Sequence, residues 1–256
     1  MIAMDEYWRE PAEEEIELLE MQSEYYQELR EKFPKLIFKY RSLARAEDFA
    51  RVLDIFQNTR LFMPKIKQLN DPFEGGNVNC LTEERNQKLA ETKDVYRILS
   101  LSEDCFSAPL WAHYATNCTG VCIGFYTDRS FQHMEPVEYV TTVDKKQWLC
   151  FDPPEAVKME YRYKNSDWAY EREYRIHREA GDEYFTFDEG EIACLLFGEN
   201  ISRDVLKTLE QVVGPMGVRL LSIKADTNRS RYYLVPSEEP EKRIYEVGDL
   251  LGHLFG

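Results

Sequence analysis

Residues 120–125 read Gly-Val-Cys-Ile-Gly-Phe, a nearly continuous apolar run that predicts a strand buried on both faces. Outward from this run, strand and helix patterns follow one another irregularly. Strands are predicted over 36–41, 60–64, 95–102, 137–143, 168–178, 191–197, 218–224 and 231–235, and helices over 46–58, 81–93, 110–115 and 202–213. Because strands outnumber helices without regular alternation, we predict an α+β fold with mixed, mostly antiparallel sheets and not a doubly wound sheet.

The organisation of the chain follows from its length and from its two ends. Its 256 residues are enough to bury one full-sized core, and no linker, repeat or low-complexity tract divides them. We therefore predict a single α+β domain over 36–235, an acidic helical extension over 1–35 and a tail with a short helix over 236–256. The amphipathic helix expected over 5–33 either packs on the domain, which is the commoner use, or docks a protein partner.

Composition limits the classes of partner. The formal charge of −15 opposes non-specific binding to nucleic acid, which needs a cationic surface. No window approaches the roughly 18 uninterrupted apolar residues of a membrane span. The N-terminal residues are acidic where a signal peptide would be basic, so we expect a cytoplasmic protein that is not in a membrane. We expect the six cysteines to be reduced and mostly buried, and we expect no metal site, because Cys118 and Cys122 lack a second Cys/His pair at zinc-site spacing.

Two basic residues share one face of the predicted strand over 36–41. Side chains alternate between the faces of a strand, so Lys39 and Arg41 lie together while Phe38 and Tyr40 face the other way. Burying two cations is costly unless an anion meets them. A pyrophosphate or a carboxylate would serve, and a solvated or salt-bridged surface pair is the simpler alternative.

A second block combines hydroxyl groups with aromatic rings. Ser100 and Ser102 share one face of the predicted strand over 95–102, and Trp111, His113 and Tyr114 follow in a short helix. Hydroxyls and rings of this kind suit a ribose and a stacked base, although core packing explains them equally well. No Ser–His–acid order is legible around His113, so we predict no hydrolytic triad.

A third block, Trp-Ala-Tyr-Glu-Arg-Glu-Tyr-Arg-Ile over 168–176, places Glu171, Glu173 and Arg175 on one face of a predicted strand. Two such carboxylates lie about 7 Å apart and raise one another's pKa unless a cation intervenes. They form either a carboxylate pair at a cleft or an outward charge ladder neutralised by Arg175. The Asn-Asp-Pro-Phe-Glu segment over 70–74 predicts a turn first and a pocket border second.

Taken in order, these blocks resemble a bacterial and phage family catalogued as a domain of unknown function, number twenty-nine seventy-one. The resemblance covers about residues 36–235 and is carried by the segments 39–43, 70–74, 100–103, 110–115, 120–125 and 168–176. The family name implies no activity. Its layout in turn resembles the ADP-ribosyltransferase fold, whose split cleft holds NAD between an Arg or His on a first strand, a Ser on a second strand followed by an aromatic, and a catalytic Glu on a later strand.

This second resemblance implies a role for each block. Glu173 would stabilise the oxocarbenium-like ribose as nicotinamide leaves, and Glu171 would orient or deprotonate the acceptor. The chain departs from the pattern on the first strand, where Lys39 takes the usual position and Arg41 follows two residues on. The resemblance also implies the residues that bind NAD. Lys39, Tyr40 and Arg41 would bind the pyrophosphate, and Ser100 and Ser102 would bind the ribose. Trp111, His113 and Tyr114 would bind the nicotinamide.

The resemblance therefore implies an NAD-dependent ADP-ribosyltransferase-like protein, with a protein or nucleic acid as acceptor and an effector or toxin role in phage–host conflict. With water as acceptor, the same site would be an NAD glycohydrolase. The alternatives are a non-catalytic nucleotide- or protein-binding module and an enzyme acting on phosphorylated nucleotides or RNA, which would need a basic cleft. The direction of Glu173, into a cleft beside Ser102 and Arg41 or out into solvent, distinguishes these interpretations.

Overall fold

The structure is a computed structural model of the chain, and it describes residues 36–71, 73–74, 82–144, 147–148, 151–179, 181–226 and 231–236. The helices predicted over 5–33 and after residue 236 lie outside these residues, as do Cys80 and Cys150. All structural statements below concern the described part of the chain.

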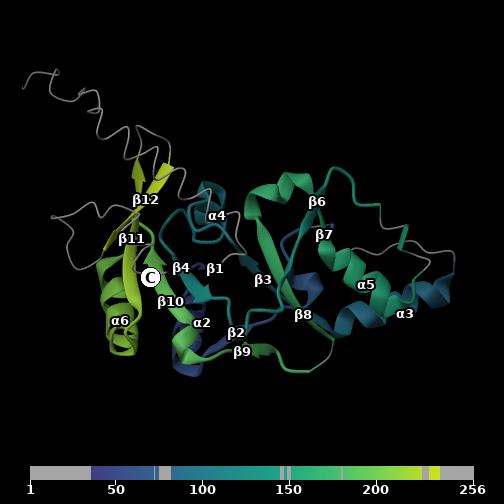
Figure 1. Ribbon diagram of the computed structural model, residues 1–256, viewed down its shortest axis with the longest axis horizontal. Coiled ribbons are helices and arrows are strands. Elements are labelled where there is room, and N and C mark those ends of the chain that lie inside the picture. Colours follow the sequence, from purple (N-terminus) through teal and green to yellow (C-terminus); the bar gives the residue numbers. More distant parts are fainter. Residues whose placement is uncertain are drawn as a thin grey trace, which may run out of the picture.

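Strands and helices alternate irregularly along the chain (Figure 1). The strands are β1 (Leu36–Arg41), β2 (Arg60–Phe62), β3 (Tyr96–Ser102), β4 (Val121–Tyr126), β5 (Glu135–Pro136), β6 (Glu138–Val140), β7 (Tyr163–Asn165), β8 (Glu173–Glu179), β9 (Tyr184–Thr186), β10 (Ile192–Phe197), β11 (Arg219–Asp226) and β12 (Arg231–Pro236). The α-helices are α2 (Ala46–Asn58), α3 (Glu83–Val95), α4 (Ala108–His113), α5 (Pro153–Arg162) and α6 (Arg203–Val213). Short 3₁₀ helices join them, among them η2 (Ile66–Gln68), η4 (Ser166–Glu171), η5 (Glu189–Glu191) and η6 (Gly214–Met216).

Most strands belong to one sheet of eight, in the order β12-β11-β10-β4-β1-β3-β8-β5. Neighbours pair antiparallel except β10 and β11, which are parallel and are connected through α6. The pairs β2-β9 and β6-β7 form two small sheets. The predicted mixed, mostly antiparallel α+β architecture is therefore confirmed.

Helices cover both faces of this sheet. On one face, side chains of α2 and α6, such as Phe56 and Leu209, pack with Ile37 and Ile123 of the central strands. On the other face, α4 packs through Trp111 against the opposite side of the same strands. Figure 1 shows α3 and α5 side by side at one end of the molecule, where they enclose a third cluster with η2 and β3. Alternate apolar side chains of β1 therefore belong to the two clusters on opposite faces of the sheet: Ile37 to the first, and Phe38 and Tyr40 to the second.

Two predicted strands differ from the structure. The segment 168–178 is extended only from Glu173, because η4 ends at Glu171 and Arg172 adopts a left-handed conformation with φ 45°. The Asn165 side chain accepts a hydrogen bond from the Asp167 backbone amide, which starts the 3₁₀ turn. The strand predicted over 137–143 is shorter: only Glu138–Val140 is extended there, as β6 of the small β6-β7 sheet, and β5 just before it belongs to the main sheet.

A left-handed turn follows α4. Thr116, Asn117 and Cys118 have φ values of 49°, 52° and 60° in succession. Two glycines make room for this turn: a Cβ on Gly120 would lie 2.3 Å from the Arg41 carbonyl oxygen, and a Cβ on Gly198 would lie 2.1 Å from the Cys118 carbonyl oxygen. The turn therefore packs tightly against the end of β1.

Other predictions concern cysteines, metals and membranes. The described cysteines are free and buried, as predicted: Cys105, Cys118, Cys122 and Cys194. The described residues contain no cluster of His, Cys, Asp and Glu that could hold a metal ion. Within the same part of the chain, every helix is too short or too polar to cross a membrane.

Candidate functional site

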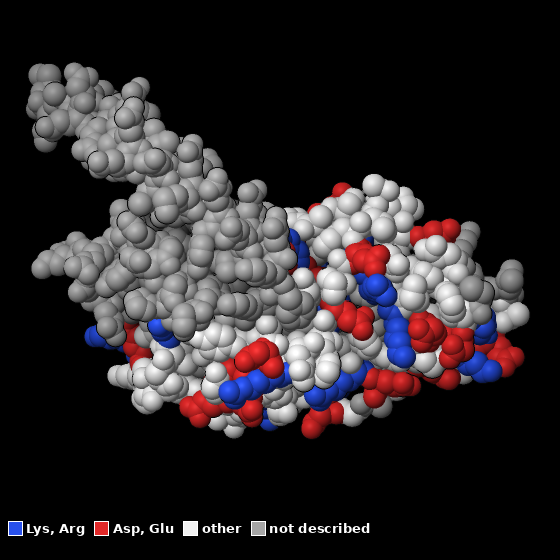
Figure 2. All heavy atoms as spheres, in the orientation of Figure 1, with Lys and Arg blue, Asp and Glu red and all other residues white. Residues whose placement is uncertain are grey.

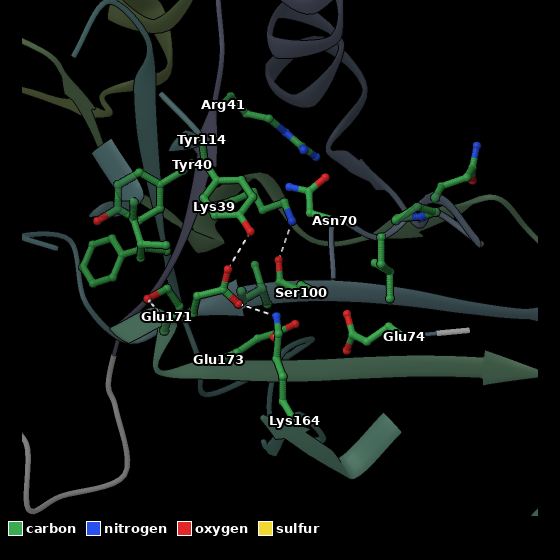
Figure 3. A pocket seen from close by; sticks show the side chains of 17 residues that line it. Lys39, Tyr40, Arg41, Asn70, Glu74, Ser100, Tyr114, Lys164, Glu171 and Glu173 are labelled. Carbon is green, nitrogen blue, oxygen red and sulfur yellow. Dashed lines mark hydrogen bonds and ion pairs between the residues drawn. The ribbon is translucent and has the colours of Figure 1, made fainter. Parts of the chain in front are cut away.

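A pocket opens where β1 and β3 separate. These strands pair only at Phe38 and Ser102, whereas β3 continues to pair with β8 along its whole length. Because the sheet is open at this point, consecutive residues of β1 and of β3, which alternate between the faces of the sheet, all line the pocket. The pocket has a volume of about 230 Å³ and is lined by Phe38, Lys39, Tyr40, Arg41, Pro64, Gln68, Leu69, Asn70, Glu74, Ser100, Leu101, Ser102, Leu110, Tyr114, Lys164, Glu171 and Glu173 (Figure 3).

Glu173 points into this pocket. It is only 5% exposed, stands opposite Ser102 in the strand register and lines the same pocket as Arg41. Arg175 donates to both of its carboxylate oxygens, from Nε at 2.7 Å and from Nη2 at 2.9 Å, and Lys164 Nζ lies 3.1 Å from Oε2. Burial raises the pKa of Glu173, but Arg175 and Lys164 outweigh it and lower the pKa to about 2. The outward charge ladder is therefore wrong, and the side chain has the direction that the cleft interpretation requires.

Lys164 joins the two carboxylates of the third block. Its buried Nζ contacts Oε2 of both Glu171 and Glu173 (Figure 3). The Tyr114 hydroxyl donates to Oε1 of Glu171 at 2.5 Å. Burial alone would lower the pKa of Lys164, but the surrounding carboxylates raise it above the ordinary value. Glu171 reaches the pocket from η4 and not from the predicted strand, and the shared cation keeps it beside Glu173.

The turn over 69–74 supplies a third carboxylate. The Phe73 backbone amide donates to the Asp71 side chain at 2.8 Å, which fixes the turn and directs Glu74 inward. Arg175 Nη2 donates to Glu74 Oε1, and Arg175 Nη1 donates to the Tyr161 carbonyl at 2.9 Å. The segment is thus both the predicted turn and, as the second interpretation had it, a border of the pocket.

The opposite wall of the pocket is basic. Lys39 Nζ donates to the Ser100 carbonyl, and the Nε of Arg41 is buried without a hydrogen-bond partner. Within the described residues, neither side chain forms a salt bridge with a carboxylate. Burial and Arg41 lower the pKa of Lys39 to about 7, and burial and Arg51 lower the pKa of Arg41 to about 10. Both side chains are half-buried in the pocket lining and neither belongs to a surface salt bridge with a described residue, so the surface-pair alternative does not describe this block.

Ser102 and the aromatic residues take different positions. The Ser102 hydroxyl donates to the Glu171 carbonyl at 2.6 Å and accepts from the Asp104 amide at 3.1 Å, so it braces the η4–β8 junction. Tyr40 lines the pocket and donates to the Asp104 carbonyl at 2.7 Å. Of the predicted helical residues, Tyr114 lines the pocket.

Trp111 and His113 lie away from the pocket lining. Trp111 is fully buried, donates from Nε1 to the Cys105 carbonyl at 2.7 Å and meets the Tyr40 ring edge-on at 5.3 Å. His113 is exposed at the end of α4. Neither side chain is placed to stack on a ligand in this pocket, because α4 turns its Trp111 face toward the core.

The sequence analysis did not identify Lys164 as a site residue. It also gave no role in the pocket to Asn70 or Gln68, which line it. Lys164 belongs to a three-residue strand in a small separate sheet, and no spacing in the sequence relates it to Glu171 or Glu173. Its cation–π contact with the Trp168 ring, 4.8 Å from the centroid, also depends on the turn of η4. The one available signal was the pair of carboxylates on one strand face, which requires cations, and Arg175 was the only cation that the local pattern offered.

A family model described as "Protein of unknown function (DUF2971)" matches residues 110–176. The predicted resemblance to this family is confirmed over these residues. The DUF2971 match begins in α4 and ends in β8, so it includes Tyr114, Lys164, Glu171 and Glu173 of the pocket. No match is found among curated proteins or among solved structures.

Proposed function

We propose that the pocket binds NAD as a substrate and cleaves its nicotinamide–ribose bond, as an ADP-ribosyltransferase or related enzyme does. One observation supports this most: Ser102 is the Cα partner of Phe38 on β1 and of Glu173 on β8. The cation, serine and glutamate strands of the implied layout are therefore adjacent, and their side chains line one pocket. This convergence is what the resemblance to ADP-ribosyltransferases leads one to expect.

The residues present suit NAD. Arg41, with its buried and unpartnered Nε, offers a charge-assisted hydrogen bond to a pyrophosphate, and Lys39 lies on the same strand. Tyr114 offers the half-buried aromatic ring of the lining for nicotinamide. The volume of about 230 Å³ is below the roughly 300 Å³ at which ligand pockets begin, so the pocket suits the reacting half of the dinucleotide.

When bound, NAD supplies a bond that breaks with its electron pair on the nicotinamide nitrogen and positive charge on the ribose, which an acceptor then neutralises with release of one proton. Glu173 stays ionised at neutral pH, since its pKa is about 2, and presents a fixed negative charge to that ribose. Glu171, held by Tyr114 and Lys164, is the second carboxylate and takes the position of proton acceptor. Ser102 keeps both carboxylates in place through its bond to the Glu171 carbonyl.

One observation favours a second candidate, a nucleotide-binding module that does not cleave its ligand. Both oxygens of Glu173 already accept hydrogen bonds from Arg175, and one of them also contacts Lys164. This compensation reduces the negative charge that the carboxylate can offer to a developing cation. If the pocket does not cleave NAD, it has no ADP-ribosyl group to transfer to a protein, a nucleic acid or water. An effector or toxin role in phage–host conflict also depends on cleavage.

The test measures free nicotinamide after incubation of purified protein with NAD, for wild type, Glu173→Gln and Glu179→Gln. Glu179 is an exposed carboxylate on the same strand and serves as the matched control. We expect release by wild type and by the control, and a loss of about 100-fold or more in Glu173→Gln. Calorimetry with NAD and thermal melts of all three proteins separate lost chemistry from lost binding or folding. NAD binding without release, with and without added acceptor proteins, would establish the binding module instead.

A further inference from the structure

Lys39 has an unusual environment for a lysine. Its Nζ donates to the backbone carbonyl of Ser100, and no carboxylate among the described residues forms an ion pair with it. The pocket carboxylates are instead held by Lys164, Arg175 and Tyr114. Figure 3 shows Lys39, Arg41 and Asn70 on one side of the pocket and Lys164 with the carboxylates on the other.

A second cation lies on the same face of β1. Arg41 follows Lys39 by two residues and also lines the pocket, with a buried Nε that has no partner. Burial and the positive charge of Arg41 disfavour an ammonium group at Lys39, whereas Glu171 and Glu173 favour it but form no ion pair with it. These are the conditions that convert a lysine side chain into an amine nucleophile.

We propose that Lys39 is a nucleophilic lysine that forms an imine with a small phosphorylated aldehyde or reducing sugar phosphate, whose phosphate Arg41 binds. This proposal uses the same pocket as NAD cleavage but does not require cleavage. It also separates the two basic residues of β1, which the resemblance treats as alternatives: Arg41 holds the anion and Lys39 carries the reactive amine.

The step balances without an oxidant or a further reactant. The neutral Nζ attacks the carbonyl carbon, a C–N bond forms, and the C=O π electrons move to oxygen, which takes a proton. Loss of water then leaves a C=N bond, so amine and aldehyde give imine and one water. The charged groups that face Lys39 are Arg41 on its own strand, Glu171 of η4 and Glu173 of β8, and its pKa of about 7 gives a large fraction of free amine at pH 7–8.

The experiment treats the folded protein with pyridoxal 5′-phosphate at pH 7.5, reduces imines with cyanoborohydride, and maps modified lysines by mass spectrometry. We expect Lys39 to be modified at least about tenfold faster than the exposed lysines, which serve as internal references: Lys67, Lys88 and Lys158. We expect this preference to fall about tenfold with pyridoxal, which lacks the phosphate, and in Arg41→Gln. Lys39→Met, which removes the amine, is expected to lose this one modification while its melting temperature is kept or raised.

The proposal is overturned if wild-type Lys39 reacts no faster than the reference lysines, or if its preference for the phosphorylated probe is unchanged in Arg41→Gln. Because the adduct is read by mass, the result does not depend on nicotinamide release. A protein that releases nicotinamide without Lys39 labelling would keep the proposed function and refute this inference. A protein that labels at Lys39 without release would do the reverse.

Discussion

Ser102 stands directly opposite Glu173 in the pairing of β3 with β8, and its hydroxyl donates a 2.6 Å hydrogen bond to the Glu171 carbonyl. The serine is thus the backbone neighbour of Glu173 in the sheet and the hydrogen-bond donor to Glu171. Its first effect is to position both carboxylates, whatever ligand the pocket receives.

Ser102→Ala removes this brace. We expect the free energy of unfolding to fall by about 1–2 kcal/mol, because a buried carbonyl loses its donor. We also expect the affinity for NAD, measured by calorimetry, to fall. Ser107→Ala is the matched control: Ser107 is also buried, but its hydroxyl reaches the Tyr170 carbonyl only at 3.4 Å. Equal losses in the two variants would contradict the special role of Ser102.

Glu173→Gln is expected to lower the free energy of unfolding at pH 7 by about 3 kcal/mol, the lower end for breaking a buried ion pair, because Glu74 and Glu171 still compensate the cations. Since the folded protein lowers the pKa of Glu173 from 4.5 to about 2, its stabilisation is present above pH 4.5 and is lost as the pH falls toward 2. Urea unfolding between pH 2.5 and 7 should therefore show a flatter acid limb for the variant. An acid limb as steep as that of wild type would exclude this carboxylate as the titrating group.

Lys39→Met is expected to stabilise the protein near neutral pH. The folded state lowers the pKa of Lys39 from 10.5 to about 7, so the cost of its charge is full below pH 7 and is relieved as the pH rises toward 10.5. We expect a gain of about 2 kcal/mol at pH 6, after allowance for solvent screening, and a smaller gain at pH 9.5. Lys67→Met at an exposed position is the control in the same urea titrations, and its effect should be small at both pH values.

Gly198→Ala is expected to destabilise the protein by about 3 kcal/mol or more, because the added Cβ would lie 2.1 Å from the Cys118 carbonyl oxygen and backbone must move. Gly190→Ala is the control, since a Cβ there meets nothing within 4 Å. Thermal melts of both variants test the packing of the left-handed turn. A small effect at Gly198 would mean that the turn is free to shift.

Thr59→Gly is expected to raise the free energy of unfolding by about 1 kcal/mol. Thr59 ends α2 with φ 44°, and a β-branched residue is strained in this left-handed conformation. Thr59→Ala keeps the Cβ and should recover much less. If Thr59→Ala raised the free energy of unfolding as much as Thr59→Gly, the strain would come from the branched threonine side chain and not from the left-handed backbone.

The sequence predicted most elements because their apolar patterns are local. The strand over 36–41 and the helix over 46–58, for example, were predicted with the bounds that β1 and α2 have. The strand predicted over 168–178 was wrong in its first half, because the same alternation of rings and charges accommodates a 3₁₀ turn and only the conformation of Arg172 decides between them, whereas its second half is β8.

The site was predictable where it depends on strands and unpredictable where it depends on neighbours in space. Lys39, Arg41, Ser102 and Glu173 lie on or next to regular strands, and the pocket includes all of them. Lys164 comes from the separate β6–β7 sheet, and the orientation of Trp111 depends on which face α4 buries. Neither fact is contained in a local pattern.

The basic wall of the pocket lies within a chain whose formal charge is −15, and Figure 2 shows acidic and basic side chains interleaved on the face in view. A phosphorylated ligand is therefore repelled at long range and attracted only after it has entered. Salt screens the long-range repulsion, over a Debye length of about 8 Å at physiological ionic strength, far more than it screens the attraction inside the pocket. Added salt should thus speed the arrival of such a ligand, whereas it slows the arrival of ligands that a basic surface steers.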